Sequence, residues 1–168
     1  MGRVGFPVLL AVLGCCLALV APARAATGGG VYDVTGVALA PSATQTTMVG
    51  VGSGSARALW RAVVDYSALA DGGTVTGGSL ALAAAGDDSV TIVRARFADG
   101  VIALVSEAPG CGTRVFSLTG SLADVTVNGE PTATGAGTYA LELTVRRAML
   151  FGRCVVYART VRGTLNLG

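Results

Sequence analysis

The sequence predicts an all-β domain: a mainly antiparallel barrel or curled β-sandwich of about eight strands, with at most one short helix. Apolar and polar residues alternate along many segments, most clearly in "TYALELTV" at 138–145. One face of that strand would carry Tyr139, Leu141, Leu143 and Val145. This is the pattern of an antiparallel sheet with a single buried face. Turns rich in Gly, Asn and Asp separate such segments, and only one stretch, 55–70, has helical spacing.

Short connections are expected between the strands. In order, the strands are expected at 31–40, 46–51, 74–84, 89–98, 101–108, 113–127, 138–145 and from Cys154 onwards. Asp99-Gly100 predicts a two-residue hairpin turn, because both residues tolerate positive φ. Asn128-Gly129 predicts a second hairpin-type turn, and Gly86-Asp87-Asp88 a further turn.

Segment 55–70 is expected to be the one helix. Ser55 would cap it, and Asp71-Gly72-Gly73 would end it. The residues at helical spacing are Leu59, Ala62, Val63, Tyr66 and Leu69. A strand with Trp60, Val64 and Tyr66 on one face remains the alternative.

The register of the last hairpin predicts an irregularity. In the last strand Val155, Tyr157, Val161 and Leu165 are expected to share a face. A two-residue turn at Gly152-Arg153 would pair the apolar face of 138–145 with the opposite face, since a one-residue slip inverts every side chain. We therefore expect an odd-length loop or a bulge at 151–155.

Four glycines recur at nearly constant spacing. Gly36, Gly78, Gly120 and Gly163 are separated by 42, 42 and 43 residues. Such a period indicates either three related β units, as in a β-trefoil, or a recurring strand feature of a barrel. The segments between these glycines match poorly, so the trefoil is the minor alternative.

The first 25 residues resemble a secretory signal peptide that is cleaved. Arg3 precedes a long apolar stretch, and Ala23-Arg24-Ala25 gives the small-x-small pattern of a cleavage site. A flexible leader at 26–30 and a single β domain at 31–168 would follow. We therefore expect a secreted or periplasmic protein without a transmembrane segment after cleavage. Lipid attachment at Cys15 is the disfavoured alternative, because it would leave apolar residues exposed.

Composition restricts the partners and the chemistry. All 12 basic residues are Arg, and the chain has no His. Together with heavy Ala, Gly and Val usage, this composition is typical of a GC-rich bacterial genome. Removal of Arg3 and Arg24 would leave ten basic residues against ten acidic ones. A neutral domain argues against a nucleic-acid partner.

The absence of His and Lys excludes most catalytic mechanisms. A Ser-His-Asp triad, a Cys-His pair and a lysine Schiff base all need one of these residues. We therefore expect a protein that is not an enzyme and has no cofactor or metal. The alternative is a carboxylate-dependent hydrolase, for which the fold would have to bring together Asp33, Asp65 and Glu142. Asp87-Asp88 is better explained as a solvated turn than as a catalytic or Ca²⁺-binding pair.

Cys111 and Cys154 are the two cysteines that would remain after cleavage, and they are expected to form a disulfide. Two thiolates without His would not complete a zinc shell. The cysteines could meet only if the strands that follow them run in the same direction, with 138–145 between them.

The segment "RRAMLFGR" at 146–153 is the most distinctive candidate for an interaction surface. The candidate residues are Arg146, Arg147, Met149, Leu150, Phe151 and Arg153. Such a cluster could bind an anionic lipid, an acidic glycan or an envelope protein. In the favoured interpretation the apolar residues end a strand inside the core while the arginines reach solvent. Arg94 and Arg96 form a weaker candidate for an anion site, and a solvated face explains them better.

These observations favour a non-enzymatic binding or structural module. A small apolar ligand inside the barrel or an envelope partner would be bound. The alternatives are an envelope-associated adhesion or assembly protein that uses 146–153, and the carboxylate hydrolase.

Overall fold

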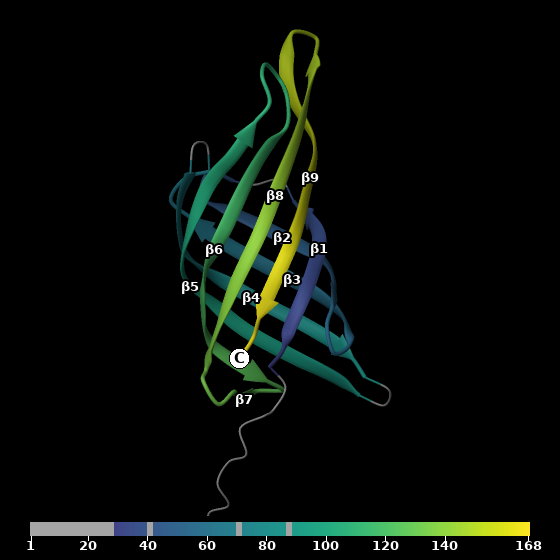
Figure 1. Ribbon diagram of the computed structural model, residues 1–168, viewed down its shortest axis with the longest axis vertical. Helices are drawn as coiled ribbons and strands as arrows, with labels where there is room; N and C mark the ends of the chain where they lie inside the picture. Colours follow the sequence, from purple (N-terminus) through teal and green to yellow (C-terminus); the bar gives the residue numbers. More distant parts are fainter. Residues whose placement is uncertain (1–28, 40–41, 70–71, 87–88) are drawn as a thin grey trace, which may run out of the picture.

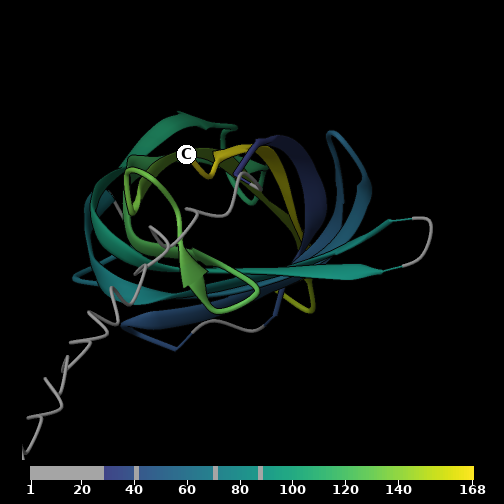
Figure 2. The same ribbon diagram turned by 90° about the horizontal axis from the view of Figure 1, so that it is seen from below.

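The computed structural model describes residues 29–39, 42–69, 72–86 and 89–168, none of which is α-helical. The strands are β1 (Val31–Ala38), β2 (Gln45–Ser53), β3 (Arg57–Tyr66), β4 (Gly72–Ala85), β5 (Val90–Glu107), β6 (Arg114–Val127), β7 (Glu130–Pro131), β8 (Ala136–Leu150) and β9 (Arg153–Asn166). All of them except the two-residue β7 form one closed antiparallel barrel (Figures 1 and 2). The predicted barrel is confirmed.

The strands follow one another around the barrel in chain order. Each long strand pairs with the next one along the chain, β8 follows β6, and β9 pairs with β1 to close the circuit. This arrangement is an up-and-down barrel. Neither a β-trefoil nor a two-sheet sandwich describes this single circuit.

The predicted helix at 55–70 is wrong, because residues 57–66 form strand β3. Its inward face carries Ala58, Trp60, Ala62, Val64 and Tyr66, all of them buried. The apolar residues of this stretch also satisfy a period of two. Because β2 and β4 both pair with β3 along its length, pairing within the sheet selects the strand period of two over the helical spacing.

The predicted hairpin at Asp99-Gly100 is also wrong, since β5 continues through both residues. On either side of this dipeptide, β5 pairs with both β4 and β6. At this dipeptide the chain does not turn, but the pairing of β5 with β6 shifts register between Phe97 and Asp99. By contrast, Asn128-Gly129 does form the turn between β6 and β7, with φ angles of 51° and 90°. Asp87 and Asp88 lie outside the described residues, and the strands on either side of them pair from Ala85 to Val90.

The irregularity expected in the last hairpin exists, but it lies elsewhere. The turn is Phe151-Gly152, and Leu150 pairs directly with Arg153. The register shifts between Arg146 and Arg147, which pair with Ala158 and Val156. This bulge restores the expected match of Tyr139 with Leu165. Val161 and Leu165 face the core as predicted, whereas Val155 and Tyr157 are exposed.

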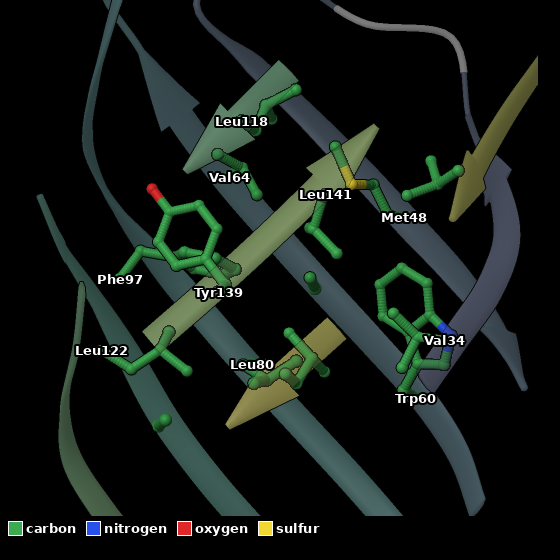
Figure 3. Packing of buried hydrophobic residues seen from close by; sticks show 14 of the residues in the cluster. Val34, Met48, Trp60, Val64, Leu80, Phe97, Leu118, Leu122, Tyr139 and Leu141 are labelled. Atoms are coloured by element: carbon green, nitrogen blue, oxygen red, sulfur yellow. The ribbon is translucent and has the colours of Figure 1, made fainter. Parts of the chain in front are cut away.

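Side chains fill the barrel interior (Figure 3). The rings of Phe97 and Tyr139 pack edge to face, with centroids 4.9 Å apart. Trp60 lies among the aliphatic residues and donates from Nε1 to the carbonyl oxygens of Thr35 and Val51, at 3.1 and 3.2 Å. The interior is therefore an apolar core whose buried indole N–H group is paired.

The four evenly spaced glycines share one structural role. A Cβ atom at any of them would collide with a carbonyl oxygen of the neighbouring strand: Val49 for Gly36, Val63 for Gly78, Asp99 for Gly120 and Ala140 for Gly163. Glycine within a strand marks a place where backbones approach closely or a sheet bends sharply. The recurrence thus reflects the bends of a barrel, not repeated units.

Candidate functional site at the end of the β8–β9 hairpin

The hairpin of β8 and β9 extends beyond the barrel (Figure 1). Strand β8 pairs with β6 up to Val145, and β9 pairs with β1 from Thr160 onwards. Residues 146–159, here called the arm, lie beyond those pairings, and their two strands pair with each other. The arm therefore stands on the continuous sheet of the barrel as a two-stranded projection.

Three large apolar residues form the apex of the arm: Met149, Leu150 and Phe151. Their exposed fractions are 63%, 51% and 95%. The expectation that these side chains end in the core is therefore wrong. The cause is geometric, because the barrel wall ends near Val145 and the strands that carry the apex continue past it.

The turn at the apex holds Phe151 in an unfavourable conformation. A two-residue hairpin turn of this kind requires positive φ at both positions, and here φ is 50° at Phe151 and 74° at Gly152. Gly152 adopts this conformation freely, whereas a bulky residue is a genuine outlier there. Phe151, the most exposed aromatic side chain among the described residues, thus stands where Asn would fit better.

The arm is fastened to the loop between β5 and β6 close to its apex, because Cys154 pairs with Met149. Cys111 of that loop and Cys154 of β9 are at disulfide distance, with their sulfur atoms in contact and their Cα atoms 5.6 Å apart. Strands β6 and β9 run in the same direction with β8 between them, as expected. In the chain-entropy treatment, closing a loop of this length stabilises the fold by about 4 kcal/mol.

Glu107 adds an ionic connection to the arm nearer the barrel, through Arg147. It accepts hydrogen bonds from Arg114 Nη2 at 3.0 Å and Arg147 Nη2 at 2.8 Å. These hydrogen bonds, that of Arg114 foremost, hold the pKa of Glu107 below its ordinary value of 4.5. Arg147 Nε also donates to the carbonyl oxygen of Gly112 at 2.8 Å.

Arg147 is therefore a structural residue and not an outward cation, since its side chain is only 16% exposed. Sequence reasoning placed it in the interaction cluster and did not find Glu107, Arg114 or Gly112. The partners of Arg147 lie 35 and 40 residues away in the chain, and no local pattern connects them.

The remaining charges of the arm are uniformly positive. Residues 146–159 contain four arginines and no acidic residue. Arg146 and Arg153 are exposed, and Arg159 is half-buried. The arm thus combines an apolar apex with cationic flanks.

The three carboxylate candidates do not meet at one centre, since Asp33 and Glu142 line one groove and Asp65 is not among its residues. Asp65 accepts a hydrogen bond from Gln45 Nε2 at 2.6 Å, and Glu142 accepts one from Arg162 Nε at 2.9 Å. Arg94 and Arg96 share an exposed face, and Arg96 pairs with Asp124 at 3.0 Å. Within the described part of the chain, no group of three or more Cys, Asp or Glu residues could hold a metal ion.

The outer surface of the barrel carries several grooves. One of about 910 Å³ lies at the base of the arm and is lined by Val37, Glu142, Arg146 and Arg162 among others. Asp33 and Glu142 both line a shallower groove next to it. A further groove, of about 620 Å³, is lined by Val51, Leu59 and Val90 among others.

No protein-family model matches the chain, and comparisons with curated proteins and with solved structures found no match either. No helix in the described ranges is long and apolar enough to cross a membrane. A barrel of this kind serves many functions, so its fold alone does not indicate one. The requirements of folding do not explain the exposed apolar apex of the arm, which is therefore the candidate site.

Proposed function

We propose that the chain is an exported, non-enzymatic binding protein that associates with a component of the bacterial envelope through the apex of its arm. The observation that carries this proposal is the position of Phe151, which is 95% exposed at the end of a fastened projection. A contiguous exposed apolar patch of several hundred Å² that is rimmed by polar residues is characteristic of an interaction site.

The energetic cost of the apex supports the proposal. An L-residue in the left-handed region loses roughly 1–2 kcal/mol, and Phe151 makes no ring contact of the kind that pairs Phe97 with Tyr139. Backbone strain at an exposed position supports a functional hypothesis when no packing gain offsets it.

The connections between the arm and the loop from β5 to β6 support the proposal further. A binding segment that is already ordered loses less conformational entropy when it binds. The Cys111–Cys154 pair and the contacts of Arg147 with Glu107 and Gly112 both restrain the arm before any partner arrives.

Export is part of the proposal. Residues 1–25, which carry the signal-like pattern, lie outside the described residues. Support for export comes from the cysteine pair, since disulfides persist in the periplasm and outside the cell. We place the protein there, with the arm directed at the envelope.

Association with the envelope is tested by co-sedimentation. Oxidised wild-type protein should sediment with envelope fragments of its host, and Phe151→Ser should lose most of this association. Leu59→Ser is the matched control, because Leu59 is 67% exposed on β3 of the barrel. Undiminished sedimentation of a folded Phe151→Ser variant would contradict the proposal.

A small apolar ligand in the barrel interior stays a prediction without a structural observation in its favour. Core side chains occupy the interior, and the two largest grooves lie outside the wall. Native mass spectrometry of protein purified from its host would reveal such a ligand as added mass.

A further inference from the structure

We propose that the component contacted by the arm is the surface of a bilayer that contains anionic phospholipids. This inference rests on the proposed function and names its partner. Three properties of the arm carry it: its shape, the order of residues along it and its charge.

The shape of the apex suits a bilayer better than a protein. The apex is the turn end of a two-stranded hairpin and presents roughly 400 Å² of apolar surface, taking about 200 Å² for each fully exposed large side chain. A stable protein–protein interface buries about 800 Å² on each partner and needs a complementary hollow. A lipid layer closes around a narrow projection and needs no preformed hollow.

The order of residues along the arm matches the layers of a membrane surface. Met149, Leu150 and Phe151 come first, and Tyr157 lies farther back with 66% of its surface exposed. Tyrosine is enriched at the level of the headgroups, where its ring and hydroxyl meet different surroundings. Apolar side chains of surface-bound proteins reach about 5–10 Å into the boundary between headgroups and acyl chains.

The charge of the arm selects anionic lipids. Arg153 pairs across the turn with Leu150 and is exposed, so this basic residue is next to the apex. Arg146 and Arg159 follow toward the barrel, and residues 146–159 hold no carboxylate that would repel lipid phosphates. The nearest acidic group fastened to the arm, Glu107, is already paired with Arg114 and Arg147.

The test is flotation with vesicles of phosphatidylcholine alone or mixed with phosphatidylglycerol. Wild-type protein should float with the mixed vesicles, and added salt should weaken binding. Phe151→Ser should lower the partition coefficient at least about tenfold. Arg146→Gln and Arg153→Gln should each lower it about fivefold, but only on the mixed vesicles.

Matched controls separate the arm from the rest of the surface. Leu59→Ser and Arg61→Gln alter exposed residues of β3 and should bind like wild type. Circular dichroism and a free-thiol titre establish that each variant is folded and oxidised. Equal losses in the controls would overturn the inference, because binding would then not reside in the arm.

The outcomes distinguish the two proposals. Phe151-dependent binding to envelope fragments without binding to either vesicle would overturn the lipid inference and leave the proposed function standing, with a protein or glycan as partner. Equal binding to both vesicles would overturn the role of anionic lipid. Absence of Phe151-dependent binding to envelope and vesicles alike would overturn both.

Discussion

Tyr139 connects the core to the barrel wall. Its ring packs against Phe97, and its hydroxyl donates a hydrogen bond to the carbonyl oxygen of Asp99 at 2.9 Å. Gly100 and Gly120 leave the space for that hydroxyl, since a Cβ atom at either position would collide with it. Burial, followed by the nearby charge of Asp99, raises the pKa of Tyr139 to about 12.

Alkaline pH should therefore destabilise the fold through Tyr139. The folded-state pKa of about 12 exceeds the ordinary value of 10, so the unfolded chain releases this proton first. The contribution to the free energy of unfolding is constant below pH 10 and is lost as pH rises toward 12. Urea titrations across this range should show a smaller decline for Tyr139→Phe. That variant should also lose about 1 kcal/mol at pH 7 with its hydrogen bond.

Gly163 provides a test of the glycine pattern. With φ of 152° and the carbonyl of Ala140 against its Cα, it has no room for a methyl group. Gly163→Ala should lower the free energy of unfolding by roughly 2–4 kcal/mol, from overpacking together with backbone strain. Gly30→Ala is the control, because its Cβ would meet only Tyr32 at 3.6 Å. Equal denaturation midpoints for the two variants would contradict the close approach.

At the scale of the residue, sequence reasoning predicts the inward face of β8 and the pairing of Cys111 with Cys154. Strict alternation identifies the first, and elimination among few cysteines identifies the second. It could not predict the contacts of Arg147 with Glu107 and Gly112 or that of the Tyr139 hydroxyl with Asp99. These join residues 35 to 40 positions apart that the folded barrel brings together.

The arm is an element whose stability and function are expected to conflict. Its Phe151-Gly152 turn has the geometry that favours Asn-Gly, and the Asn128-Gly129 turn of the same chain uses that pair. The β6–β7 hairpin therefore has the residues that its turn favours. The β8–β9 hairpin, at the candidate site, has Phe151 at the position where Asn is favoured.

Phe151→Asn should stabilise the protein and abolish its association. Relief of the unfavourable φ should raise the free energy of unfolding by about 1 kcal/mol. Loss of the ring should reduce envelope and vesicle binding as strongly as Phe151→Ser does. Thermal denaturation and flotation of the same preparations measure both effects. A variant that lost stability and kept binding would show that Phe151 serves the fold.

Elements were predicted best where periodicity and turn chemistry agree. They agree in β8 and at Asn128-Gly129, and both predictions are confirmed. They disagree in β3, where helical spacing coexists with alternation, and in β5, where Asp99-Gly100 interrupts an 18-residue strand. In both cases pairing with two neighbouring strands outweighs the local preference.

At the scale of the molecule, we expect the barrel to unfold as one cooperative unit because its first and last strands pair. Val34 lies opposite Gly163, and Leu165 lies opposite both Tyr32 and Tyr139. An up-and-down circuit follows from short connections between successive strands, so the sequence could indicate it. Closure could not be read from any local segment, since it joins residues about 130 positions apart.

Leu165→Ala on β9 should change the unfolding of the whole barrel, and a probe on another strand should report that change. Leu165 is fully buried on β9, and its truncation should lower the free energy of unfolding by roughly 2–5 kcal/mol. Trp60, the single tryptophan, lies on β3. Because opening the β1–β9 seam should unfold the whole circuit, Trp60 fluorescence and far-ultraviolet circular dichroism should report one coincident, shifted transition. If the fluorescence midpoint stayed at the wild-type value while the circular dichroism midpoint fell, β3 would be stable without closure, and the barrel would consist of separable parts.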